Sequence, residues 1–318
     1  MKRVFANHPT RVFSAIVATV LLGLAWTTGC RMIESTADSL STASEGTALA
    51  PIFGGVARAA ESMRDYSPAE EHYIGRSVAA EILSRYRVHP DAELQRYVQL
   101  VGHAVLAAPE ARKTLTGYHF VVLEGDELQA VSTPGGFVFL TAGTVRRARD
   151  EDELSSVIAH EIAHVTLNHG IKSIKAATRK KSLALLMQGV GQGVSEGAGA
   201  AGGEQQLAEL AVVFADAIQD ITSDLLVKGY TRETELEADK LALTLLQASG
   251  YARSGLKGYL EAMDASSAGG SKAGGGGGWY ATHPTAEARI ACLGAAGAAN
   301  ADGRETRRAR FAATVKRG

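Results

Sequence analysis

The pentapeptide His-Glu-Ile-Ala-His at residues 160–164 constrains this chain more than any other feature. On a helix, residues four apart lie one turn apart on the same face, so His160 and His164 present both imidazoles in one direction. Two such imidazoles match two corners of a tetrahedral zinc site. Apolar residues surround the histidines and predict a buried helix: Val157, Ile158, Ile162 and Val165.

The acid inside this motif has a different position from the histidines. Glu161 is rotated by about 100° from His160, so it can reach a water beside the metal without being a ligand. Its carboxylate would take a proton as that water attacks a carbonyl carbon. The alternative is a pair of core histidines satisfied by backbone carbonyls. We expect Gly170 to end this helix, and His169 to cap it or support a ligand rather than bind metal.

A third ligand is needed, and the segment YTRETELEAD at 230–239 offers several carboxylates. Their alternation suggests a strand, but the residues that follow are typical of a helix. Helical steps from Glu233 lead through Glu237 to other polar residues, which indicates a solvated face. The same steps from Glu235 lead through Asp239 to alanines and leucines, which indicates a buried face.

Two buried carboxylates need a compensating cation. No cation in the local sequence matches Glu235 and Asp239, and the simplest candidate is a zinc held by HEIAH. Glu235 would then be the third ligand, and Asp239 would accept a hydrogen bond from a ligand imidazole. The alternative is a structural ion pair with Arg232 or with a lysine elsewhere.

The segments HEIAH, YTRETELEAD and THPTAEARI together resemble the gluzincin zinc metallopeptidase family that includes the CAAX prenyl endopeptidase, HtpX and BepA-type periplasmic proteases. The resemblance covers roughly residues 68–295 and implies one Zn²⁺ per chain. It implies Glu235 as the third ligand and Asp239 as its partner acid. It also implies that His283 lies near the metal, as a fourth ligand that can keep the enzyme latent or as a donor on the oxyanion side. Arg289 is expected to be structural or an ion-pair partner of this region.

The segment STPGGFVFLTAG resembles the family's edge strand above the zinc. An extended substrate peptide would add to such a strand through backbone hydrogen bonds. Pro134 cannot donate to a ladder, so we expect the strand to begin near Gly136, toward a sheet edge. Gln129-Ala130 departs from the Asn-Ala that the family often has. The substrate-binding residues expected from the resemblance are Gly135, Gly136, Phe137, Val138 and Phe139.

The fold class expected is α+β and mainly helical, a zincin-like metalloprotease domain with a small sheet whose edge strand borders the cleft. Ser67, Pro68 and Glu70 form a capping pattern that begins a helix. The chain divides into a signal peptide, a flexible tether, the protease domain and a basic tail expected to be solvated: 1–29, 30–66, 67–300 and 301–318.

The N-terminus indicates export. A basic stretch precedes a short apolar run that ends in TTGC, which resembles a bacterial lipobox and predicts lipidation of Cys30. The alternative is a plain signal peptide or an N-terminal anchor. We expect a lipid-anchored protein on the periplasmic face of the outer membrane. Cys292 then has no intrachain partner, so no disulfide supports the fold.

Composition limits the classes of molecule that this protein is expected to bind. The net charge of −1 and an aromatic content of 6% argue against nucleic-acid binding. The expected activity is zinc-dependent endopeptidase cleavage of unfolded or misassembled envelope proteins. A non-catalytic periplasmic chaperone or assembly factor with a structural zinc is the alternative, although such a site needs no base like Glu161. An exopeptidase would need a subsite for a free terminus, and no feature of the sequence specifies one.

Overall fold

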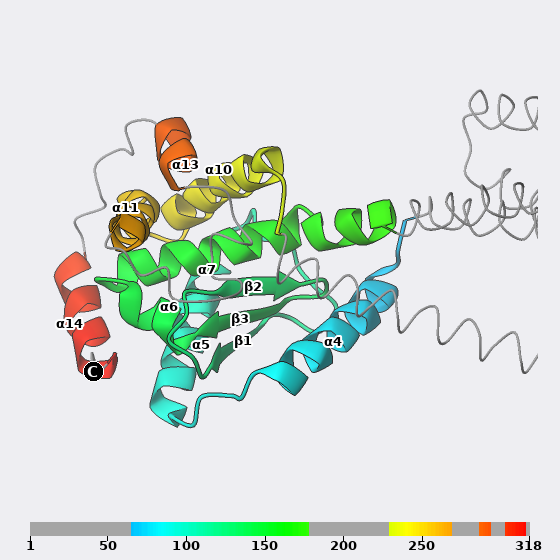
Figure 1. The fold of residues 1–318 in the computed structure, drawn as a ribbon, viewed down its shortest axis with the longest axis horizontal. Coiled ribbons are helices and arrows are strands. Elements are labelled where there is room, and N and C mark those ends of the chain that lie inside the picture. The colour runs from blue at the N-terminus through cyan, green and yellow to red at the C-terminus, as the bar shows by residue number, and fades with distance from the viewer. Residues whose placement is uncertain (1–64, 178–228, 269–285, 294–302, 316–318) are drawn as a thin grey trace, which may run out of the picture. The chain divides into compact units, whose positions relative to one another are not determined.

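The computed structural model describes residues 65–177, 229–268, 286–293 and 303–315 (Figure 1). The elements below lie within these ranges, and each is positioned by local sequence signals as well as by packing.

Two helices begin with side-chain caps. Helix α4 (Pro68–Arg85) has the predicted capping box, in which the Ser67 hydroxyl accepts from the Glu70 amide and the Glu70 carboxylate accepts from the Ser67 amide. Helix α5 (Ala92–Val105) begins with Asp91, whose carboxylate accepts from two amides of the first turn. Both helices therefore start where the sequence indicates.

A three-stranded sheet follows, with the order β1-β3-β2. Strand β1 (His119–Leu123) runs parallel to β3 (Phe137–Thr141), and β2 (Ala130–Thr133) runs antiparallel to it. Gly135 and Gly136 join β2 to β3 with φ values of +79° and +100°, which side chains rarely adopt. The glycines thus allow the tight return that makes β3 the central strand.

The two faces of the sheet carry separate apolar clusters, because side chains alternate along a strand. One face packs on α5 and on α7 (Glu151–Thr166) through Phe120, Val122, Ala130, Val138 and Leu140. The other face packs on α4 through Leu123, Val131 and Phe139. The sheet is therefore covered on both sides.

Helix α7 lies between the sheet and a second helical layer. Helices α10 (Arg232–Ala248) and α11 (Ser254–Ala268) pack against its far side (Figure 1). Helix α6 (Ala142–Arg147) follows β3 directly and precedes α7 in the chain. Helix α13 (Ala286–Leu293) contacts both α10 and α11. Every residue of α7 up to Val165 is buried, as the apolar residues around its histidines predict.

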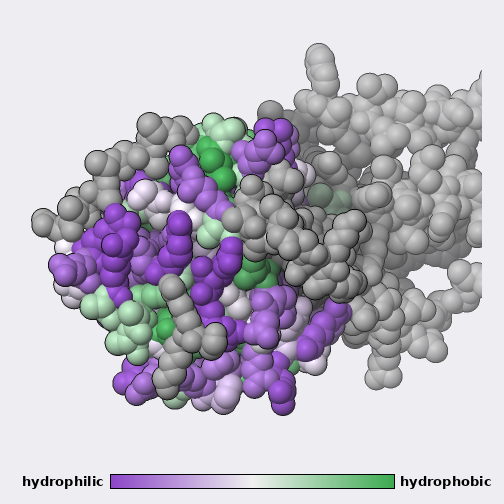
Figure 2. All heavy atoms as spheres, turned by 60° about the vertical axis from the view of Figure 1, so that its left-hand side comes forward, coloured by the Kyte–Doolittle hydropathy of each residue, from purple (hydrophilic) through white to green (hydrophobic). Residues whose placement is uncertain are grey.

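Helix α14 (Arg304–Thr314) differs from the solvated basic tail expected after residue 300. It packs on α5 and α7, and Phe311 is only 2% exposed. Its arginines pair with buried acids in the first turn of α7: Arg307 with Asp152 and Arg310 with Glu151. Figure 2 brings the α11 and α14 side forward and shows a mainly hydrophilic surface. Each of these long arginine side chains can contact a buried carboxylate and still reach solvent.

The described residues confirm a mainly helical α+β fold with a small sheet. Within those ranges, no helix has both the length and the apolar character that crossing a membrane requires. Cys30 and the apolar run before it lie outside the described residues.

Candidate metal centre

The HEIAH helix is shaped by its own sequence. The Asp150 carboxylate caps α7 by accepting from the Glu153 amide. The helix ends at Thr166 rather than at Gly170, because Asn168 adopts a left-handed conformation with φ +58°. Residues 169–177 are again helical, so Gly170 lies inside a helix.

Helix α10 follows the predicted phase. Thr231 caps it by accepting from the Thr234 amide. Glu235 and Asp239 are 0% and 1% exposed, whereas Glu233 and Glu237 are exposed. The acidic run is thus one helix with a buried and a solvated pair, and the strand-like alternation is not structural.

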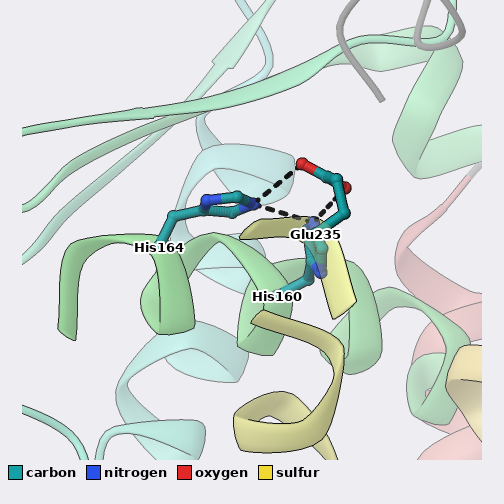
Figure 3. A group of neighbouring side chains, drawn as sticks. All are labelled: His160, His164 and Glu235. Carbon is teal, nitrogen blue, oxygen red and sulfur yellow. Dashed lines mark hydrogen bonds and ion pairs between the residues drawn. The ribbon is translucent and has the colours of Figure 1, made fainter. Parts of the chain in front are cut away.

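Three donor groups converge between α7 and α10 (Figure 3). The Nε2 atoms of His160 and His164 lie 3.0 Å apart. The two carboxylate oxygens of Glu235 lie 3.3 Å from these nitrogens, one from each. All three side chains are buried.

These spacings fit a zinc ion. Ligand atoms about 2.0–2.1 Å from zinc at tetrahedral angles lie about 3.3 Å from one another. Two imidazole nitrogens and one carboxylate are also the donor set of known catalytic zinc sites. Without a cation, two facing imidazole nitrogens and a buried carboxylate would have to share protons. The chemistry and the spacing of His160, His164 and Glu235 therefore agree with the metal expected from the sequence.

Glu161 lies in the same buried environment, with 1% exposure. Its charge is close enough to influence the pKa of both His164 and Tyr230. It does not belong to the three-residue donor group. This position agrees with the expectation that Glu161 acts beside the metal rather than on it.

Asp239 is held by Arg289, the arginine expected to be structural or an ion-pair partner of this region. Arg289 of α13 is fully buried and donates to both Asp239 oxygens, at 2.6 and 2.8 Å. Asp239 in turn lies 3.0 Å from Nδ1 of His160. Arg289 also lies 3.4 Å from Glu235. A metal ion would therefore not be the only cation beside these carboxylates.

Arg232, the arginine suggested from the sequence as an ion-pair partner for these carboxylates, is exposed. The ion pair forms with Arg289 instead. Arg289 belongs to the segment THPTAEARI, which carries part of the family resemblance. That membership is the signal from which an ion-pair role in this region is expected. No local spacing connects it to Asp239.

The pKa values follow from these contacts. Burial alone would lower the pKa of His160, but Glu235 and Asp239 raise it to about 9 against the opposing charge of Arg289. Burial lowers the pKa of His164 to about 4. Burial would raise the pKa of Asp239, yet Arg289 and His160 hold it well below its usual range.

His169 and Tyr230 support His164. Nδ1 of His169 lies 2.9 Å from Nδ1 of His164, and its Nε2 lies 3.4 Å from Glu237. This contact agrees with a supporting role rather than ligation. The Tyr230 ring stacks on the His164 ring, with centroids 4.3 Å apart and planes 17° apart. The sequence analysis did not single out Tyr230.

The expected substrate strand needs correction. Residues 137–141 form β3, which is central and hydrogen-bonded on both sides, so Phe137, Val138 and Phe139 cannot receive an added strand. Gly135 and Gly136 lie in the turn before it. The error arises because Pro134 does indicate an edge strand, but that strand is β2, which precedes the proline, and not β3, which follows it.

Strand β2 is the edge strand that packs against α7. The carbonyl of Gln129 accepts from Thr141, so with antiparallel alternation the main-chain groups of Ala130 and Ser132 point away from β3. The side chain of Gln129, which departs from the family pattern, accepts a hydrogen bond from the Tyr86 hydroxyl through its carbonyl oxygen.

A family model described as peptidase family M48 matches residues 92–296. The chain belongs to peptidase family M48. This family is one of metallopeptidases, and the match includes His160, His164, Glu235, Asp239 and Arg289. The M48 assignment confirms the resemblance expected from the motifs.

Named relatives are distant. A beta-barrel assembly-enhancing protease of Yersinia pestis is 29% identical over 200 residues, or 63% of this chain and 38% of the relative. Its namesake from Escherichia coli K12 is 28% identical over 201 residues, with the same coverage. The mitochondrial metalloendopeptidase OMA1 of Schizosaccharomyces pombe is 29% identical over 157 residues, or 49% of this chain and 40% of the relative. The chain thus matches about two fifths of each relative's length.

Proposed function

We propose that this M48 protein is a zinc-dependent endopeptidase with a zincin-like catalytic domain. The observation that carries the proposal is the convergence of His160, His164 and Glu235, with Glu161 buried on the same helix as the two histidines. The spacing of the three donor atoms suits one zinc per chain. A structural zinc would not require the adjacent carboxylate.

When bound, zinc would lower the pKa of a water and polarise the peptide carbonyl. Glu161 takes a proton from the attacking water and passes it to the leaving amine. Asp239 accepts from Nδ1 of His160 and so fixes the ring with Nε2 toward Glu235. Arg289 holds the Asp239 carboxylate in place through two hydrogen bonds.

The substrate would bind as an added strand along β2 rather than along residues 135–139. The outward main-chain groups of Ala130 and Ser132 can pair with an extended polypeptide. This mode reads the main chain more than side chains, which suits unfolded or misassembled proteins as substrates. It also places the polypeptide on the strand that contacts the HEIAH helix.

The proposed location is the periplasmic face of the bacterial outer membrane, with a lipid anchor at Cys30. The lipobox-like TTGC supports it. The two bacterial relatives are named for enhancing beta-barrel assembly. Transmembrane β-barrels of bacteria lie in the outer membrane. Unfolded envelope proteins are therefore the proposed substrates.

His283 is proposed to lie near the metal, as a fourth ligand or a donor on the oxyanion side. It lies outside the described residues. Support comes from its place just before α13, whose Arg289 contacts both Asp239 and Glu235. If His283 keeps the enzyme latent, a His283→Ala variant cleaves casein faster than wild type, and an unchanged rate removes this role.

The function is tested with a fluorogenic peptide blocked at both termini, alongside unfolded casein. An endopeptidase cleaves both and yields internal fragments by mass spectrometry. Cleavage of free-ended peptides alone, with release of single residues, would replace the proposal with an exopeptidase. No cleavage by zinc-loaded wild type or by His283→Ala would favour a chaperone.

A further inference from the structure

A small hollow lies beside His164, at the end of the edge strand. It is lined by β2 and the turn after it, by the end of α7, and by Tyr230. Its volume is about 10 Å³. That is roughly the room that one water molecule or one carbonyl oxygen needs, and it is too small for a side chain.

Ser132 faces this hollow from the sheet. It alternates with Thr133, whose hydroxyl bonds to the Gly75 carbonyl on the α4 side, so Ser132 points toward α7. Ser132 is 4% exposed, and its hydroxyl has no hydrogen-bond partner in the part of the chain that the structure describes.

Tyr230 faces the same hollow from the other side. Its ring stacks on His164, and its buried hydroxyl also lacks a hydrogen-bond partner among the described residues. A phenol hydroxyl carries its proton at neutral pH and can donate a hydrogen bond.

Buried hydroxyls are normally hydrogen-bonded, and leaving one unpaired costs stability. Here two of them line a single space with room for one atom. We propose that Ser132 Oγ and Tyr230 Oη jointly donate hydrogen bonds to one main-chain carbonyl oxygen of the bound polypeptide, and so position the substrate against the His164 side of the site. This inference rests on the proposed function, because it names how that site holds its substrate.

A main-chain carbonyl fits better than any other acceptor. The hollow adjoins Ser132, whose own main-chain groups point outward from β2, so a polypeptide added there passes its entrance. Ser132 and Tyr230 offer two hydroxyl donors, and the lining contains no carboxylate, lysine or arginine, which suits a neutral oxygen. Recognition of a carbonyl is also independent of the substrate's side chains.

The test uses zinc-loaded full-length protein carrying Glu161→Gln, so that a labelled unfolded peptide binds without being cleaved. Fluorescence anisotropy gives the Kd. We expect Tyr230→Phe and Ser132→Ala each to raise Kd about 5- to 10-fold, as for one lost hydrogen bond. The double variant should raise Kd by less than the product of the two single increases, because both hydroxyls share one acceptor.

A matched control removes a hydroxyl that does not line the hollow. Tyr86→Phe loses a bond to Gln129 and should not change Kd. A scan of peptides with one carbonyl replaced by a thioamide then identifies the bound oxygen. A thioamide at one peptide position should weaken binding to the Glu161→Gln protein. The same thioamide should have no effect when Ser132→Ala and Tyr230→Phe are also present.

An unchanged Kd with an altered melting temperature would mean that the hydroxyls hold only a structural water, and would overturn the inference. A thioamide effect that persists in the double variant would do the same. Failure of the proposed function is distinguishable, because it would show as tight peptide binding without cleavage when Glu161 is intact. The binding comparison still decides the role of the two hydroxyls in that case.

Discussion

Replacing Glu161 with glutamine lowers kcat for peptide cleavage at least about 100-fold, the range expected when a general base is lost. Glutamine keeps the size of the side chain but cannot accept the proton. The three donor residues are untouched, so the variant should retain one zinc per chain. Steady-state kinetics on the doubly blocked peptide, with metal content by mass spectrometry, gives both quantities.

The matched control is Glu233→Gln, which makes the same chemical change on the solvated face of α10. It should leave kcat within about twofold of wild type, since it touches nothing in the site. If Glu161→Gln stays folded and zinc-loaded and still cleaves at the wild-type rate, Glu161 is not the base.

Replacing Arg289 with methionine destabilises the protein by about 3–5 kcal/mol, the usual effect of removing one partner from a buried ion pair. Asp239 would remain as a buried carboxylate, with Glu235 beside it. Because Asp239 also orients His160, zinc affinity should fall by about 10- to 100-fold. Urea unfolding of metal-free protein and competitive zinc titration measure the two effects separately.

Two further variants sharpen this prediction. Arg87→Met breaks an exposed pair with Glu124 and should change stability by only about 0–1 kcal/mol. Combining Arg289→Met with Asp239→Asn removes both charges and should recover part of the stability, but not the zinc affinity. A loss below about 1 kcal/mol for Arg289→Met alone would contradict the role assigned to this ion pair.

The parts of the site that could be predicted from the sequence are those set by helical geometry. His160 and His164 are one turn apart whatever the rest of the chain does. Glu235 and Asp239 could be separated from their exposed neighbours by phase alone. Arg289 could not be connected to Asp239 in this way, because their contact depends on how α13 packs on α10.

Non-local pairing explains the other differences. The capping signals locate the starts of α4 and α7, but nothing local sets the order of three short strands, so the sequence wrongly predicts β3 as an edge strand. The arginines of α14 look solvated in sequence because their partners lie about 150 residues earlier, at the start of α7. Tyr230 and Ser132 were missed because an unpaired hydroxyl is visible only once its surroundings are known.

The most direct test of the central claim is removal and return of the metal in one sample. Wild-type protein is stripped with a chelator, dialysed, and titrated with zinc while cleavage of the doubly blocked peptide is followed. If His160, His164 and Glu235 hold a catalytic zinc, cleavage disappears in the metal-free protein and returns fully at one zinc per chain. Cleavage that persists without metal, or a fully zinc-loaded protein that remains inactive even as His283→Ala, would contradict it.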